Sequence, residues 1–306
     1  MIEYYKKTSK DEILLKIEKF SKDCWIKSID PNEDELKLLS KKFSLDKELL
    51  KDGLDIYETP RIVEEDSNFY FFFRVPLNGN SKEESTSSFL FIISKNCVIT
   101  LSKFDLEIFH KISRFKSFYT DKKTRILLLF LSIISKSFWE SSRDILKSVR
   151  KNKINISQFE NKDLFKLVIQ EDVLNDYLYS FSPLIDMYTH MLKIKSIEFK
   201  EEEKEDIEDL IVDLNQTFNT CRTALKNMST MRDYYSATLT NNLNKIINLL
   251  TIFTIVLTVP TVISSMYGMN IKLPFQNNPY LFFFLLLLIM VIWLLIILFF
   301  RKKKVI

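Results

Sequence analysis

The stretch that decides the fold reads IINLLTIFTIVLTVPTVISSMYGMN and covers residues 246–270. Its apolar part, residues 246–266, contains no charged side chain and has the length of about 20 residues that a helix needs to cross a bilayer. A second apolar stretch follows at residues 280–300. Everything before residue 240 is polar enough to be soluble. The sequence therefore predicts a water-soluble body that carries a two-helix membrane hairpin.

The predicted fold class is an α+β soluble N-terminal domain with a long helical stalk and this transmembrane hairpin. Residues 61–75 and 88–101 are rich in β-branched and aromatic residues, so we expect a cytoplasmic α/β domain over 1–120. Residues 121–200 are expected to be helices packed on that domain. No Gly or Pro occurs from residue 201 to 259, so a stalk helix (201–245) should run directly into the first span (246–266). The remaining segments are expected to be an extracellular loop (267–279), the second span (280–300) and a basic cytoplasmic tail (301–306).

The first span carries a polar stripe: Thr254, Thr258, Thr261 and Ser265, spaced four, three and four residues apart. These intervals place all four hydroxyls on one helical face. A lipid-facing helix seldom carries such a stripe, because unpaired polar groups in hydrocarbon are costly. The hydroxyls either bond to their own backbone or to a neighbouring helix, or they line a water-filled path formed by several copies, which we favour. The same face continues toward the cytoplasm through Leu250, Ile247 and Asn244, which predicts an apolar constriction there.

Charge predicts the orientation of the hairpin. Arg301, Lys302, Lys303 and Lys304 follow the second span, whereas the loop over 271–279 contains only Lys272. By the positive-inside rule, both ends lie in the cytoplasm and the loop lies outside the cell membrane.

Composition excludes other classes of function. The net charge is only +4 and no basic patch with interleaved aromatics occurs, so nucleic acid is not an expected partner. With three glycines there is no phosphate-binding loop, and no nucleophile–base pair or metal-ligand spacing stands out, so we expect neither an enzyme nor an organic cofactor. The acidic residues over 201–213 are either a solvated helix start or a place where cations bind between copies.

Gly268-Met269-Asn270, preceded by Tyr267 and by Pro260-Thr261 in the first of two C-terminal spans, resembles the motif of the CorA family of magnesium transporters. The likeness extends to Cys24-Trp25-Ile26, Thr59-Pro60-Arg61-Ile62, Phe73-Arg74-Val75-Pro76 and Glu208-Asp209-Leu210. The resemblance implies a funnel-shaped homopentamer whose first spans line the pore. It implies that Gly268, Met269 and Asn270 select the ion, that Asn244, Leu250, Thr261 and Ser265 line the pore, and that Asp233 forms a cytoplasmic ring. It also implies that Asp209 helps to bind regulatory Mg²⁺ between subunits, which favours closure.

The chain departs from the family pattern at several positions. The external loop has no acid, only Asn277 and Asn278; Ile247-Asn248 replaces a Met-Lys pair at the gate, and Thr258 replaces a Met. The sequence does not identify the N-terminal acid that should partner Asp209; Glu83 and Glu84, in a polar loop, are the candidates.

The functional hypothesis is a channel-type transporter for Mg²⁺, with Co²⁺ and Ni²⁺ as further candidates. Two charges that cross about 100 mV inward gain roughly 4.6 kcal/mol, so the membrane potential suffices to drive entry. The alternatives are a Zn²⁺-transporting relative and a non-conducting two-span receptor. The receptor would need neither the hydroxyl stripe nor Asn270.

Overall fold

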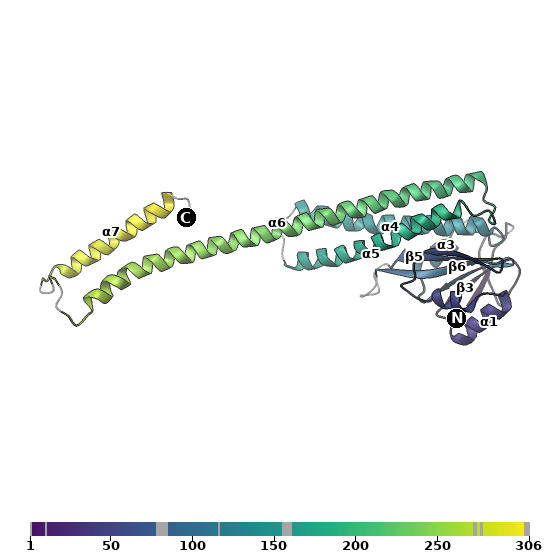
Figure 1. Ribbon diagram of the computed structural model, residues 1–306, viewed down its shortest axis with the longest axis horizontal. Coiled ribbons are helices and arrows are strands. Elements are labelled where there is room, and N and C mark those ends of the chain that lie inside the picture. Colours follow the sequence, from purple (N-terminus) through teal and green to yellow (C-terminus); the bar gives the residue numbers. More distant parts are fainter. Residues whose placement is uncertain are drawn as a thin grey trace. The chain divides into compact units, whose positions relative to one another are not determined.

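The structure is a computed structural model that describes residues 2–9, 11–77, 85–115, 117–154, 161–271, 274–275 and 278–302. The chain forms two compact units, Met1–Met231 and Arg232–Ile306 (Figure 1). The division falls inside one helix, α6 (Glu201–Tyr267), which contributes to both units.

A seven-stranded sheet forms the centre of the first unit, in the order β2-β1-β3-β7-β6-β5-β4. The strands are β1 (Ile2–Lys6), β2 (Leu15–Ile17), β3 (Cys24–Ile29), β4 (Arg61–Glu65), β5 (Asn68–Pro76), β6 (Thr86–Ile93) and β7 (Cys97–Ser102). Each of the two predicted β-rich stretches contains an antiparallel hairpin. The first hairpin turns at Asp66 and Ser67, whose φ angles of 49° and 62° are those of a tight turn that matches the strand twist. Among the pairings of these described strands, only that of β3 with β7 is parallel.

One face of the sheet is covered by α1 (Glu33–Phe43) and α2 (Lys47–Asp52), as Figure 1 shows for α1. Successive residues of a strand point to opposite faces, so Tyr70 and Phe72 pack with these helices while Phe71 and Phe73 belong to the core on the other face. At the start of α1, Asn32 and Glu35 form a capping box that satisfies the first free backbone amides.

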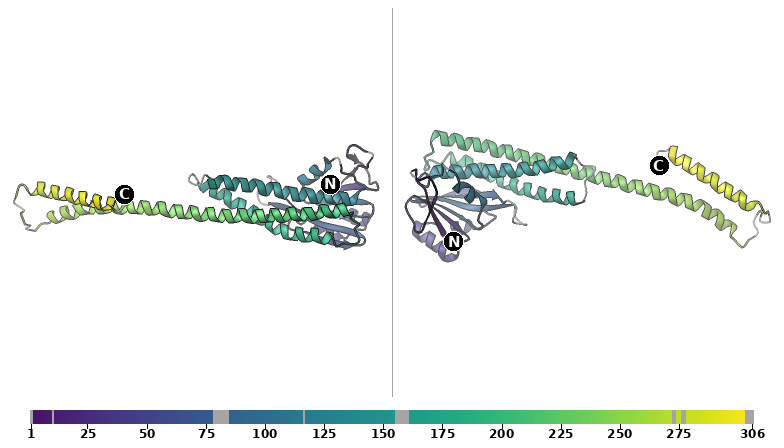
Figure 2. Two further views of the ribbon diagram at one scale, coloured as in Figure 1. Left: turned by 90° about the horizontal axis from the view of Figure 1, so that it is seen from above. Right: turned by 180° about the vertical axis from the view of Figure 1, so that it is seen from behind.

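The other face is covered by α3 (Glu107–Ser113), α4 (Lys123–Ile154) and α5 (Asn161–Met191), and the first part of α6 packs against α4 and α5 (Figure 2). Phe130 of α4 lies on the sheet, with its ring centroid 5.0 Å from that of Phe91 and 5.7 Å from that of Phe89. The helices expected to pack on the domain are therefore present. Pro183 lies inside α5 without ending it.

The predicted uninterrupted helix from residue 201 through the first span is confirmed, since α6 has 67 residues. Glu203 fixes its first turn: the side chain is buried and accepts hydrogen bonds from the Lys200 amide at 3.1 Å and the Thr124 hydroxyl at 3.3 Å. Within the first unit, α6 buries a stripe at seven-residue intervals, formed by Ile207, Leu214, Cys221 and Met228. Such a repeat keeps one helix face against its neighbours over many turns. The second unit contains the rest of α6 and α7 (Leu281–Lys302).

Candidate ion path

The apolar end of α6 is almost wholly exposed in the single chain. Only 6% of its most apolar 18-residue window is buried, whereas the core helix of a soluble protein would be mostly buried. By length and composition α6 is able to cross a membrane, and α7 adds the apolar helical stretch Leu281–Ile296. Because burial of apolar surface drives folding in water, this surface requires lipid or further protein chains around it.

One face of α6 in the second unit is partly covered, and α7 runs back along it (Figure 1). Ile252 is 7% exposed, and the positions of intermediate burial nearby are Val256, Val259, Pro260 and Ile263. At about 100° per residue, these five positions fall on one side of the helix. The indole nitrogen of Trp293 on α7 donates a hydrogen bond to the Val256 carbonyl at 2.8 Å, so this side faces α7.

The predicted polar stripe lies on the opposite side of α6. Thr254, Thr258, Thr261 and Ser265 are all exposed, and the same helical period places them about half a turn away from Val256. The predicted continuation, Leu250, Ile247 and Asn244, is exposed on the same side, with Leu250 at 65%. The seven residues predicted to line a path therefore share one face of α6, and α7 leaves that face uncovered.

The hydroxyl protons of the three threonines of the stripe are used inside the helix. Thr254 donates to the Leu250 carbonyl at 2.9 Å, Thr258 to the Thr254 carbonyl at 2.7 Å, and Thr261 to the Leu257 carbonyl at 2.7 Å. Thr217, in the first unit, makes the same bond to Asp213 at 2.8 Å, so this bonding is a property of threonine in a helix and not of the stripe. A hydroxyl oxygen that donates still has lone pairs to accept hydrogen bonds. The outward face of the stripe is thus a row of acceptors.

The Gly-Met-Asn segment begins where α6 ends. The Gly268 amide donates to the Ser264 carbonyl at 2.9 Å, and a Cβ atom at residue 268 would lie 3.2 Å from that same oxygen. A side chain at residue 268 would crowd the last helical turn. Glycine avoids this contact and lets the backbone stay close to the end of α6. Met269 and Asn270 follow and are exposed.

Asn278 has a role that the sequence did not reveal. Its side-chain oxygen accepts a hydrogen bond from the Tyr280 amide at 3.0 Å, and its carbonyl accepts one from the Leu281 amide at 3.1 Å. The Leu281 amide is the first of α7, where backbone donors have no helical partner, and the Tyr280 amide directly precedes it. Asn278 therefore orders the turn that leads into α7. Asn277, Lys303 and Lys304, together with Glu83 and Glu84, lie outside the described residues.

Asp209 lines a pocket of about 250 Å³ between α4 and α6, together with Asp206, Arg125 and Ser132. Asp209 is exposed, as is Asp233 at the start of the second unit. Among the described residues, no three His, Cys, Asp or Glu side chains are placed to hold a metal ion together. A cation at Asp209 would therefore need ligands from another chain or from water. Arg125, a positive charge in the same pocket, was not foreseen because it lies on another helix.

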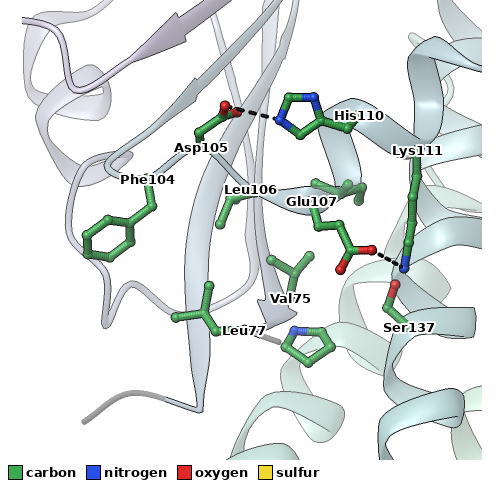
Figure 3. A pocket seen from close by; sticks show the side chains of 11 residues that line it. Val75, Leu77, Phe104, Asp105, Leu106, Glu107, His110, Lys111 and Ser137 are labelled. Atoms are coloured by element: carbon green, nitrogen blue, oxygen red, sulfur yellow. Dashed lines mark hydrogen bonds and ion pairs between the residues drawn. The ribbon is translucent and has the colours of Figure 1, made fainter. Parts of the chain in front are cut away.

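A larger pocket of about 540 Å³ lies in the first unit, lined by the end of β5, by α3 and by the segment before it (Figure 3). Its polar side chains contact one another: the His110 ring nitrogen lies 3.1 Å from Asp105, and the Lys111 ammonium lies 3.3 Å from Glu107. Asp105 also binds the Lys27 ammonium at 2.8 Å. These pairs stabilise the domain, and none of the residues predicted for the path lies in this pocket.

The chain resembles known proteins over nearly its whole length. Residues 21–302 match the family model described as CorA-like Mg²⁺ transporter protein. The Cobalt/magnesium transport protein CorA of Methanocaldococcus jannaschii is 30% identical over 273 residues, which are 84% of this chain and 83% of that protein. The Magnesium transport protein CorA of Wolinella succinogenes is 24% identical over 260 residues, 80% of this chain and 79% of that protein.

Among solved structures, the complete structure of the CorA magnesium transporter from Methanocaldococcus jannaschii superposes with a TM-score of 0.85 at 23% identity. The match covers 100% of this chain and 99% of that chain. The predicted architecture, an α/β soluble part followed by a long helix and a further apolar helix, is therefore confirmed as a known fold.

Proposed function

Since the chain belongs to the family of CorA-like Mg²⁺ transporter proteins, we propose that it is a channel-type transporter that carries Mg²⁺ into the cytoplasm. The observation that carries this proposal is the exposed polar face of α6, which lies opposite the face that meets α7. A helix that only anchors a receptor needs no such face. The alternatives of Zn²⁺ transport and of a non-conducting receptor are less favoured, because both named relatives transport magnesium.

The path requires several copies, because one helix encloses no lumen. We propose a homopentamer in which the polar faces of five α6 helices point inward and the five α7 helices form an outer ring. The outward acceptors of Thr254, Thr258 and Thr261 then meet water, and water molecules around a cation point their protons outward. A row of acceptors therefore suits a hydrated cation.

Asn270, with the backbone of Gly268 and Met269, is proposed to select the ion at the outer mouth. Mg²⁺ gives up its water reluctantly, so neutral amide and carbonyl oxygens hold the ion through its water shell without trapping it. The basic residues Arg301 and Lys302 at the end of α7 support an orientation with both ends of the chain in the cytoplasm and this mouth outside.

Regulation is proposed at Asp209 and at the Asp233 ring. Copies of the acidic start of α6 repel one another unless a cation lies between them, so Mg²⁺ bound at Asp209 would favour the closely packed, closed assembly. Rising internal Mg²⁺ then limits its own entry. The exposure of Asp209 and Asp206 supports this role, since both acids are accessible from outside the subunit.

The test of transport is Mg²⁺ uptake into proteoliposomes by the wild type and by Asn270→Ala. We expect uptake to fall at least about tenfold in the variant, because the amide oxygens at the mouth are lost. Asn242→Ala, an amide removed from α6 away from the stripe, is the matched control and should keep wild-type uptake. Equal uptake by both variants would remove the assignment of selectivity to Asn270.

The test of regulation is the internal Mg²⁺ concentration that halves uptake. Asp209→Ala should raise this concentration, because one ligand of the closing ion is lost. Asp213→Ala removes an exposed acid one turn further along α6 and should leave the concentration unchanged. A shift of the same size in both variants would indicate a general charge effect and no site at Asp209.

A further inference from the structure

Pro260 leaves a gap in the hydrogen bonding of α6. Proline has no amide proton, so the carbonyl four residues earlier, that of Val256, lacks its regular helical donor. Both residues lie in the apolar part of α6. In hydrocarbon no water is present to replace the missing donor, and an unsatisfied carbonyl is costly.

The missing donor comes from α7. The indole nitrogen of Trp293 donates to the Val256 carbonyl at 2.8 Å, across 37 positions of sequence. Tryptophan is suited to this place, because its ring is apolar and its nitrogen is a donor only. The rest of α7 from Leu281 to Ile296 is built from apolar side chains, so this bond is a specific polar contact within an otherwise non-directional interface.

The position of the bond relates it to the path. Val256 lies between Thr254 and Thr258 in sequence but on the opposite side of the helix, where Ile252 is buried and Pro260 half-buried. A proline with a freed carbonyl is where a helix bends most easily. The bond from Trp293 therefore lies at the turn of α6 that bends most easily, residues 256–260. This turn is at the same height along the helix as the polar stripe.

We propose that Trp293 is a positioning residue: its indole replaces the hydrogen bond that Pro260 removes, and through it α7 sets the bend of α6 at residues 256–260. A change in that bend then requires α7 to move with α6 or the bond to break. The effect on Mg²⁺ passage rests on the proposed function, whereas the hydrogen bond and its effect on the helix do not.

The first test is hydrogen exchange of the full-length protein in detergent, read at the backbone amides of residues 261–264. Trp293→Phe keeps an aromatic ring and removes the donor, so these amides should exchange about threefold faster, the size expected for one average hydrogen bond between membrane helices. Pro260→Ala restores the amide at residue 260. In that background, Trp293→Phe should change the exchange by less than about 1.3-fold, because Val256 then has its own helical donor.

Equal acceleration with Pro260 present and in the Pro260→Ala background would overturn the proposal, since the ring would then act by packing alone. If Trp293→Phe folds only together with Pro260→Ala, the proposal is supported, because the restored amide rescues the chain. If it folds in neither background, the proposal is overturned.

The second test measures the internal Mg²⁺ concentration that halves uptake. Trp293→Phe should shift it by about threefold, again with no further shift in the Pro260→Ala background. If Trp293→Phe acted only through lost packing, it would lower the amount of folded protein equally with Pro260 and with Pro260→Ala. If the wild type takes up no Mg²⁺, the proposed function fails, and the exchange measurement still decides the role of Trp293.

Discussion

Lys27 lies in the first unit with its side chain only 8% exposed, and it forms an ion pair with Asp105. Its ammonium lies 2.8 Å from Asp105 and 5.4 Å from the centroid of the Phe109 ring. Partial burial acts to raise the pKa of Asp105, but the hydrogen bond and charge of Lys27, together with His110, lower it overall. The folded state therefore favours the ionised carboxylate.

Asp105→Asn should destabilise the folded chain by about 1–2 kcal/mol at pH 7, because a buried ammonium loses its anion; the half-exposed carboxylate limits the loss. A group with a lowered pKa in the folded state contributes stability above its unfolded pKa, and this contribution is lost as the pH falls through the lower, folded value. The difference between wild type and variant should thus shrink in acid, below about pH 4.

Denaturant unfolding at a series of pH values measures this difference. Asp144→Asn, which removes an exposed partner of Lys147, is the control and should change stability little at any pH. A constant difference between wild type and Asp105→Asn from pH 7 to pH 3 would contradict the account of Lys27 and Asp105.

The three cysteines, Cys24, Cys97 and Cys221, are free and buried. Burial raises the pKa of Cys97 to about 12 and that of Cys221 to about 11, and it also raises the pKa of Cys24. Because the thiolate is the reactive form, we expect no reaction with a thiol reagent at pH 8 in the folded protein and reaction of all three after unfolding. Fast labelling of any one of them in the folded state would show that its site opens.

At the scale of elements, α6 behaves differently in its two units. Up to Met231 it buries a heptad stripe against α4 and α5, and beyond Arg232 nearly every side chain is exposed. The same helix thus supplies a core to the soluble unit and an uncovered surface to the hairpin. The two faces of the second part differ in turn: one meets α7, and the other carries the hydroxyls, Leu250 and Ile247.

The apolar part of the uncovered face should act as the closed gate. Leu250→Ser should leave uptake measurable at internal Mg²⁺ concentrations that stop the wild type, because a hydroxyl ring keeps water in the constriction. Leu249→Ser places the same change on the other side of α6, and in this variant the path should still close at the internal Mg²⁺ concentrations that stop the wild type. Uptake in proteoliposomes preloaded with Mg²⁺ separates the two variants. Complete closure of the Leu250 variant would remove that residue from the gate.

At the scale of the whole molecule, the proposed homopentamer rests on the exposed surface of the second unit. Exposed apolar side chains on both α6 and α7 need lipid or neighbouring copies, and the exposed hydroxyl oxygens of α6 can still accept hydrogen bonds from water. Lipid covers the apolar side chains but offers these oxygens no donor. A ring of copies satisfies both.

From the resemblance to the CorA family we expect five copies per particle in mild detergent, measured by light scattering with the detergent mass subtracted or by native mass spectrometry. One or two copies would favour the receptor alternative, because so few helices enclose no path. The sheet domain supplies a control, since Asp105→Asn should alter its stability without changing the number of copies.

The sequence by itself determined the helices, the hairpin and the face that carries the hydroxyls. Helical period and apolar length are local properties, so α6 and α7 begin and end close to the predicted residues, and α4 and α5 lie within the predicted helical region 121–200. Strand pairing is not local. The β-rich stretches were recognised, but the parallel contact of Cys24–Ile29 with Cys97–Ser102 joins segments about 70 residues apart, and no short pattern encodes it.

Only the tertiary structure decided which side of α6 meets α7, where Arg125 lies relative to Asp209, and what satisfies the carbonyl of Val256. The sequence shows that Pro260 removes a hydrogen bond, because that loss follows from the residue alone. It does not show that Trp293 restores the bond, because the partner is set by how two helices pack in space.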